Sequence, residues 1–173
     1  MPESGQPVIL LAEDSADDVD MFRRAFRQAY IEAPLHVVSD GDEAMAYLNG
    51  EGKFANRAEF PLPDLFLLDL KMPRTNGFEV LAWLRTHPTL CPLRTVVLTT
   101  SEDIKDVTRA YAFGANSFLT KPLDFIEFKN TLQEMFTFFL TRAKTPQVTR
   151  SAPRQGLGSE RIAGPAPFPD KKE

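Results

Sequence analysis

The sequence has a single cysteine, Cys91, among 173 residues, which excludes an internal disulfide. It has no long apolar run, which excludes a signal peptide and a membrane-spanning helix. It also has no basic patch, and its formal net charge is −4, so its electrostatic field repels the phosphate backbone of nucleic acids. These absences predict a protein of the reducing cytoplasm that binds neither membranes nor nucleic acid.

Residues 145–173 are poor in the apolar side chains that a packed core needs. They contain five prolines, three glycines and one aromatic residue, Phe168. They also hold five Lys or Arg against three Asp or Glu, which leaves the preceding residues at a charge of −6. We therefore predict one domain over residues 1–144 and a disordered, Pro- and Gly-rich tail over residues 145–173.

Five short apolar runs alternate with segments of helical periodicity. Three of the runs are continuously apolar, as is typical of parallel strands that helices cover on both faces. Alternation of strand and helix predicts an open, doubly wound α/β sheet with right-handed crossovers. The five runs are residues 8–11, 35–38, 65–68, 95–98 and 117–119.

The last predicted helix, residues 124–142, is richer in apolar side chains than one core-facing stripe requires. Three of them, Ile126, Phe138 and Leu140, fall outside the stripe at about 100° per residue. Two interpretations stay open: these side chains pack under a loop, or they form a subunit interface. The stripe itself consists of Phe125, Phe128, Leu132, Met135, Phe136 and Phe139.

Polar residues follow four of the five predicted strands. Because ligands of open α/β sheets bind beyond the carboxyl ends of the strands, these residues are the candidate site. Neighbouring carboxylates repel one another unless a cation holds them, and an oxygen-only cluster suits Mg²⁺. A hydroxyl and an ammonium beside them suit a phosphoryl group, so the pattern indicates phosphoryl transfer to an aspartate nucleophile. The residues are Glu13, Asp14, Asp69, Thr99 and Lys121.

The order and spacing of these residues, together with flanking motifs, resemble the receiver domains of two-component response regulators. The resemblance covers about residues 7–142 and implies a flavodoxin-like fold with strand order 2-1-3-4-5. The motifs that carry it are Glu13-Asp14 in LLAED, Asp69 in LLDLKMP followed by Asn76-Gly77, Thr99 in VLTTS, Gly114-Ala115 and Lys121-Pro122.

The resemblance also implies the role of each acidic residue. Asp69 would accept a phosphoryl group from a phosphohistidine on a sensor histidine kinase. Asp14, Asp69 and the backbone carbonyl of Lys71 would ligate Mg²⁺, and Glu13 would act through a bound water.

The same resemblance assigns the switch residues. Lys121 would pair with the phosphoryl oxygens, Thr99 would hydrogen-bond the new phosphate, and Phe118 would turn inward behind it. It further implies a cis peptide bond before Pro122.

No output domain is expected after the last predicted helix, because neither a helix-turn-helix pattern nor an enzymatic motif follows it. The chain looks most like the single-domain regulators that are paired with phytochrome-type sensor kinases and that dimerise through the last helix. We therefore expect a signalling protein that is not an enzyme. Its expected partners are a sensor kinase and a second copy of the chain.

Two other functions remain as alternatives. In one, the protein is a phosphohydrolase with Asp69 as its nucleophile, although Lys71 stands where such hydrolases place a second aspartate as general acid. In the other, it is a receiver-like scaffold that binds partners without phosphorylation.

Overall fold

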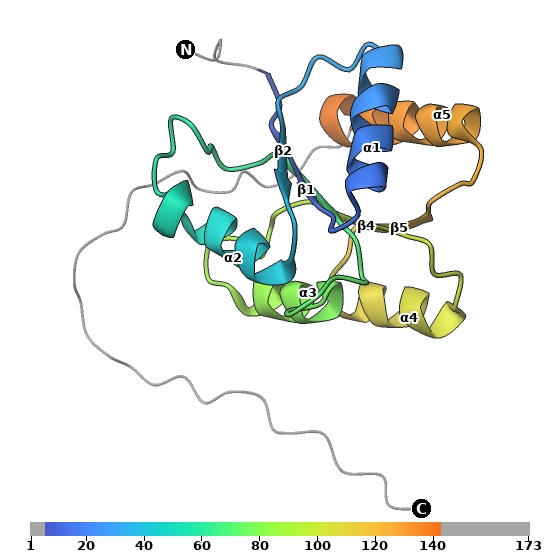
Figure 1. The fold of residues 1–173 in the computed structure, drawn as a ribbon. Coiled ribbons are helices and arrows are strands. Elements are labelled where there is room, and N and C mark those ends of the chain that lie inside the picture. The colour runs from blue at the N-terminus through green and yellow to red at the C-terminus, as the bar shows by residue number, and fades with distance from the viewer. Residues whose placement is uncertain (1–5, 143–173) are drawn as a thin grey trace, which may run out of the picture.

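Five parallel strands form the middle layer of the computed structural model, which describes residues 6–142 (Figure 1). The strand order is β2-β1-β3-β4-β5, which confirms the predicted doubly wound topology. Each strand begins and ends within one residue of its predicted position. The strands are β1 Ile9–Ala12, β2 Leu35–Val38, β3 Leu65–Leu68, β4 Thr95–Thr99 and β5 Ser117–Thr120.

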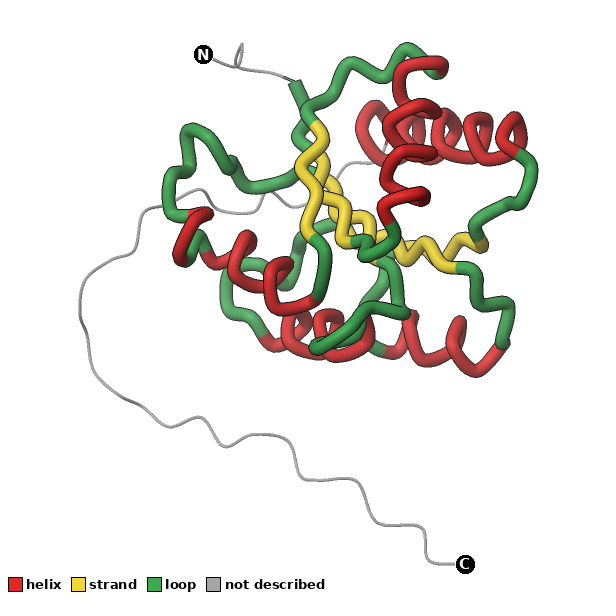
Figure 2. Tube along the Cα trace, in the orientation of Figure 1, coloured by secondary structure: helices red, strands yellow, loops and turns green. Residues whose placement is uncertain are grey.

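Helices cover both faces of the sheet. Figures 1 and 2 show α1 and α5 on one face and α2, α3 and α4 on the other, with the strands between them. A short 3₁₀ turn, Gly52–Phe54, interrupts the long connection between α2 and β3. The helices are α1 Ala16–Gln28, α2 Gly41–Asn49, α3 Gly77–Thr86, α4 Ile104–Ala112 and α5 Phe125–Phe136.

Each of the five α-helices begins after a side chain that accepts a hydrogen bond from its first turn. Such capping satisfies backbone N–H groups that have no partner within the helix. At α3 the cap is reciprocal, because Asn76 accepts from the Glu79 amide and the Glu79 side chain accepts from the Asn76 amide. The capping residues are Ser15, Asp40, Asn76, Asp103 and Asp124.

The central strands are buried on both faces, as their continuous apolar sequences predict. Leu10 packs on the side of α2 to α4, whereas Ile9 and Leu11 pack on the side of α1 and α5. On the latter side, Phe22 and Phe128 meet edge to face with ring centroids 5.0 Å apart and fasten α1 to α5. The sheet is therefore packed against apolar side chains on both of its faces.

The end of the chain differs from the prediction of one helix over residues 124–142. Asp124 is the cap of α5, and after Phe136 the chain continues as a π-helix, Thr137–Arg142. Hydrogen bonds to the fifth residue along widen a π-turn, which shifts side chains away from the 100° pattern. The predicted stripe faces the core, and Leu140 also packs partly against it.

Within residues 6–142, no helix is both long and apolar enough to cross a membrane. The predicted tail, residues 145–173, lies outside the described residues.

Candidate functional site

Three carboxylates meet at the carboxyl edge of the sheet, as predicted. Glu13, Asp14 and Asp69 each offer an oxygen atom, and these atoms lie within 4.8 Å of one another. The register explains this, because Ala12 on β1 pairs with Leu68 on β3 and the next residues of both strands are the acidic ones. Glu13 and Asp69 are buried, whereas Asp14 is exposed. Such a set of hard oxygen donors fits a divalent cation.

Burial dominates the electrostatics of Asp69, which is only 6% exposed. Burial raises its pKa, although the Lys121 charge and hydrogen bonds from Thr99 and from the amides of Leu70 and Lys71 act in the opposite direction. The Leu70 amide donates to Asp69 Oδ1 at 2.8 Å. Burial likewise raises the pKa of Glu13. The site thus confines negative charge that a cation would stabilise.

Lys121 lies among the buried charges, and its nearest protein partners were not part of the sequence prediction, which paired it with phosphoryl oxygens. Its Nζ atom donates to Glu13 Oε2 at 2.5 Å and to Asp18 Oδ2 at 2.7 Å, and it lies 3.9 Å from Asp69 Oδ2. Burial acts to lower the pKa of Lys121, but the hydrogen bonds to Asp18 and Glu13 and the charge of Asp69 outweigh it, so the pKa is raised. The sequence interpretation missed Asp18, because an aspartate in the first turn of a helix is ordinary and signals no site.

The expected cis peptide before Pro122 is wrong, since none of the peptide bonds in the described part of the chain is cis. A trans bond is favoured by about 0.5–1 kcal/mol before proline in the absence of other constraints. The Lys121 side chain reaches Glu13 and Asp18 from the trans backbone.

Thr99 and Phe118, the two predicted switch residues, lie on β4 and β5. Thr99 is fully buried, and its hydroxyl hydrogen-bonds Asp69. Phe118 is half-buried and packs against the core on the side of α2 to α4. The Phe118 amide donates to the Tyr111 hydroxyl on α4 at 3.2 Å, a contact that the sequence did not reveal.

The loop between β3 and α3, which carries Lys71, passes so close to two glycines that neither position has room for a side chain. A Cβ atom on Gly77 would lie 2.4 Å from the carbonyl oxygen of Asp69, and one on Gly41 would lie 2.2 Å from that of Thr75. The Gly41 amide donates to this Thr75 oxygen at 3.1 Å, and an ion pair joins Arg74 to Asp40. The side chain of Lys71 itself is exposed. These contacts tie the loop to the start of α2.

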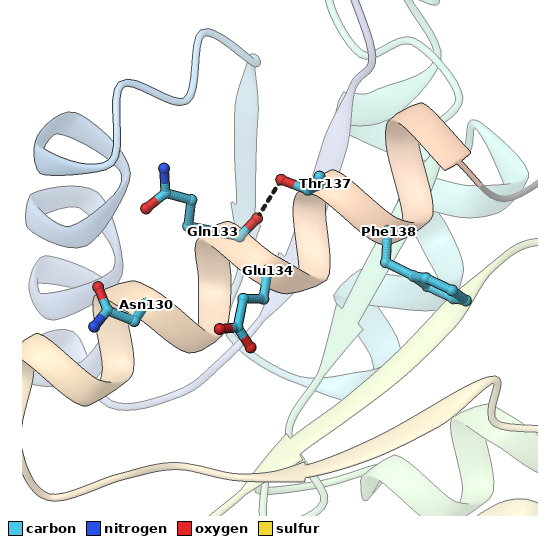
Figure 3. Close-up of a pocket in the computed structure, with 5 residues that line it drawn as sticks. All are labelled: Asn130, Gln133, Glu134, Thr137 and Phe138. Atoms are coloured by element: carbon cyan, nitrogen blue, oxygen red, sulfur yellow. Dashed lines mark hydrogen bonds between the residues drawn. The ribbon is translucent and has the colours of Figure 1, made fainter.

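The three candidate interface residues differ in their exposure to solvent. Ile126 and Phe138 are 55% and 56% exposed, whereas Leu140 is half-buried against the core. Leu140 is thus a poor interface candidate, because the π-turn directs it inward. A shallow hollow on the outer side of α5 and the π-helix has Phe138 at one end; in Figure 3, Phe138 points away from the helix on the same side as Glu134. The lining residues are Asn130, Gln133, Glu134, Thr137 and Phe138.

Comparison with known proteins agrees with this geometry. Residues 9–133 match the model of the response regulator receiver domain. The chain is 37% identical over 145 residues to the response regulator Rcp1 of Synechocystis sp., and the match covers 83% of this chain and 97% of Rcp1. The crystal structure of the Mn²⁺-bound form of Rcp1 has a TM-score of 0.73 at 35% identity, and the match covers 82% of this chain and 99% of that one.

Two further solved structures are similar. The response regulator RPA3017 in red light signaling of R. palustris is 36% identical with a TM-score of 0.78, and the match covers 82% of this chain and 99% of that chain. The phosphorylated cyanobacterial phytochrome response regulator RcpA is 34% identical with a TM-score of 0.76, and the match covers 83% of this chain and 100% of that chain. The chain therefore belongs to the response regulator receiver domain family.

Proposed function

We propose that Asp69 accepts a phosphoryl group from a phosphohistidine of a sensor histidine kinase in a Mg²⁺-dependent step. One observation carries the proposal: the carboxylate oxygens of Glu13, Asp14 and Asp69 gather within 4.8 Å while Lys121 Nζ lies 3.9 Å from Asp69. A nucleophile, a set of cation ligands and a fixed positive charge thus share one edge of the sheet.

In the transfer step, an Asp69 carboxylate oxygen attacks phosphorus. The new O–P bond forms as the P–N bond to the kinase imidazole breaks, and the bonding electron pair stays on the ring, which takes up a proton to leave a neutral histidine. The Lys121 ammonium receives the phosphoryl oxygens, and the Thr99 hydroxyl donates a hydrogen bond to the phosphate once it is on Asp69. Phe118 turns inward behind Thr99.

Asp14, Asp69 and the backbone carbonyl of Lys71 would hold Mg²⁺, and Glu13 would act through a water molecule. The contacts of Glu13 support its indirect role, since one carboxylate oxygen accepts from Lys121 and the other from the Ser15 amide at 3.0 Å. When bound, Mg²⁺ supplies positive charge to the phosphoryl oxygens. The Mn²⁺-bound form of the relative Rcp1 supports a divalent cation here.

Mass spectrometry of the intact protein tests this function directly. Incubation with Mg²⁺ and a small acyl phosphate should add one phosphoryl group to the wild type. The adduct should be absent from Asp69→Asn and from wild type in excess chelator, because the first lacks the nucleophile and the second the cation. A second incubation replaces the acyl phosphate with a phosphorylated sensor kinase. If wild type gains no phosphoryl group from the phosphorylated kinase, the proposal fails.

The output of the switch is a change in protein contacts. Phosphorylation converts the Asp69 carboxylate into an acyl phosphate that carries up to two negative charges and three terminal oxygens next to Thr99, which favours a new arrangement of the nearby loops. We infer a phytochrome-type sensor kinase as the partner, because RcpA and RPA3017 are described as a phytochrome response regulator and as part of red light signaling. The acidic charge of the domain argues against nucleic acid as a target.

We further infer that two copies associate through the end of the last helix. Phe138 supports this, because more than half of a large apolar side chain faces solvent there. Phe138→Ala should weaken self-association, and sedimentation velocity across a dilution series would measure it. Ile104→Ala is the control: it removes an apolar side chain that is 72% exposed on α4, outside the three candidate interface residues. A Phe138→Ala variant that sediments like wild type at every concentration would contradict the interface.

A further inference from the structure

A closed ring of hydrogen bonds joins the start of α1 to Lys121. Glu13 Oε1 accepts from the Ser15 amide at 3.0 Å, and Ser15 Oγ accepts from the Asp18 amide at 3.2 Å. Asp18 Oδ2 and Glu13 Oε2 then accept from Lys121 Nζ at 2.7 and 2.5 Å. Asp18 is therefore held at both its backbone and its carboxylate.

This ring determines where the ammonium lies relative to Asp69. An ammonium has three donors, and two of them point to Glu13 and Asp18. The distance of 3.9 Å from Lys121 Nζ to Asp69 Oδ2 is too long for a hydrogen bond. One donor is thus left for an anion that arrives beside Asp69.

Asp18 differs from the other carboxylates around Lys121 because it does not belong to the cluster of Glu13, Asp14 and Asp69. Those three oxygens are the candidate ligands of a cation. The Asp18 side chain, 29% exposed, can therefore stay paired with Lys121 when the other three carboxylates bind a cation.

We propose that Asp18 is a positioning residue for phosphoryl transfer: it holds the Lys121 ammonium on the α1 side of the site, away from the attacking carboxylate of Asp69. This inference rests on the proposed function above. Without the Asp18 carboxylate, the described residues leave Lys121 only Glu13 and Asp69 as ion-pair partners. An ammonium bound to Asp69 occupies the lone pairs that must attack phosphorus.

Asp18→Asn tests the proposal, with Asp17→Asn as its matched control. Asp17 lies in the same helical turn and is exposed. Its substitution by Asn removes the same charge, but the residue does not contact Lys121. Loss of a charged hydrogen-bond partner should slow phosphorylation by the acyl phosphate roughly tenfold in Asp18→Asn. Asp17→Asn should stay within about twofold of wild type, and Asp18→Glu, which restores the charge, should recover most of the rate.

A double-mutant cycle in metal-free buffer measures the pairing without any phosphorylation. Urea unfolding of wild type, Asp18→Asn, Lys121→Met and the double variant should show that the two side chains are coupled at least about tenfold in the unfolding equilibrium constant. Asp18→Asn should not destabilise the Lys121→Met variant, since the partner is gone.

The two measurements separate the possible failures. If wild type never gains a phosphoryl group, the proposed function fails, and the cycle alone decides whether Asp18 holds Lys121. Equal phosphorylation rates in Asp18→Asn and Asp17→Asn would overturn the positioning role, and so would a coupling below about twofold in the cycle.

Discussion

Gly77→Ala is expected to destabilise the fold by about 3 kcal/mol, because the added methyl group has no space to occupy. Its Cβ would lie 2.4 Å from the Asp69 carbonyl oxygen and 2.8 Å from Leu70 Cα, and both are backbone atoms that cannot rotate away. The Gly77 amide also donates to the Leu70 carbonyl at 3.1 Å. Any relief must therefore move the backbone of the phosphoacceptor itself, and uptake of phosphate from the acyl phosphate should fall with stability.

Gly52→Ala is the control for this experiment. Gly52 has a φ of +55° and no atom within 4 Å of the position of a Cβ, so the substitution adds backbone strain without a collision. It should cost about 1 kcal/mol and leave phosphate uptake unchanged. Urea unfolding of both variants gives the comparison, and a Gly77→Ala variant as stable as Gly52→Ala would show that the loop accommodates the methyl group.

Lys121→Met in metal-free buffer is expected to cost about 3–5 kcal/mol, because it leaves buried carboxylates without their ammonium. The Lys121 side chain is 5% exposed and that of Glu13 is 1% exposed, so solvent cannot replace the lost partner. Lys105→Met, at an exposed site on α4, should change stability by less than about 0.5 kcal/mol. Mg²⁺ should still bind the variant and restore part of the loss, since the cation ligands remain. A loss no larger than that of Lys105→Met would contradict the buried ion pair.

The cost of Lys121→Met should grow as the pH rises. Burial raises the pKa of Glu13 above its usual 4.5 and that of Asp69 above its usual 3.8, and Lys121 counteracts both shifts. Between the usual and the raised values the folded state binds more protons than the unfolded state, so stability falls as pH rises through that interval. Removing Lys121 raises both pKa values further, which extends the interval upward. Unfolding curves between acid and neutral pH should thus diverge from those of wild type, and parallel curves would contradict this electrostatic account.

Sequence alone predicted the sheet and the position of the acidic edge because both depend on local patterns. Continuous apolar runs such as Leu65–Leu68 allow a strand buried on both faces, and the residue after such a run must lie at the carboxyl edge. The pairing of Ala12 with Leu68 then brings Glu13 and Asp69 together without any further information.

What the sequence did not predict depends on contacts between elements. The pairing of Asp18 with Lys121 joins α1 to the residue after β5, and nothing in the first turn of a helix distinguishes a functional carboxylate from one that favours the helix dipole. The π-helix after Phe136 has the composition of an ordinary helix end, so Leu140 was placed outside the core-facing stripe, although it packs partly against the core. The bond between the Phe118 amide and Tyr111 likewise links β5 to α4.

The ion pair of Glu13 with Lys121 joins residues 108 positions apart, nearly the full span of the fold. During synthesis the chain emerges from its N-terminus, so Glu13, Asp14 and Asp69 all leave the ribosome well before the lysine that balances them. A nascent chain that ends ahead of residue 121 holds the repelling carboxylates but not their counter-charge. The site can therefore form only after the last strand and Lys121 have been synthesised, and a chain truncated before residue 121 cannot assemble it.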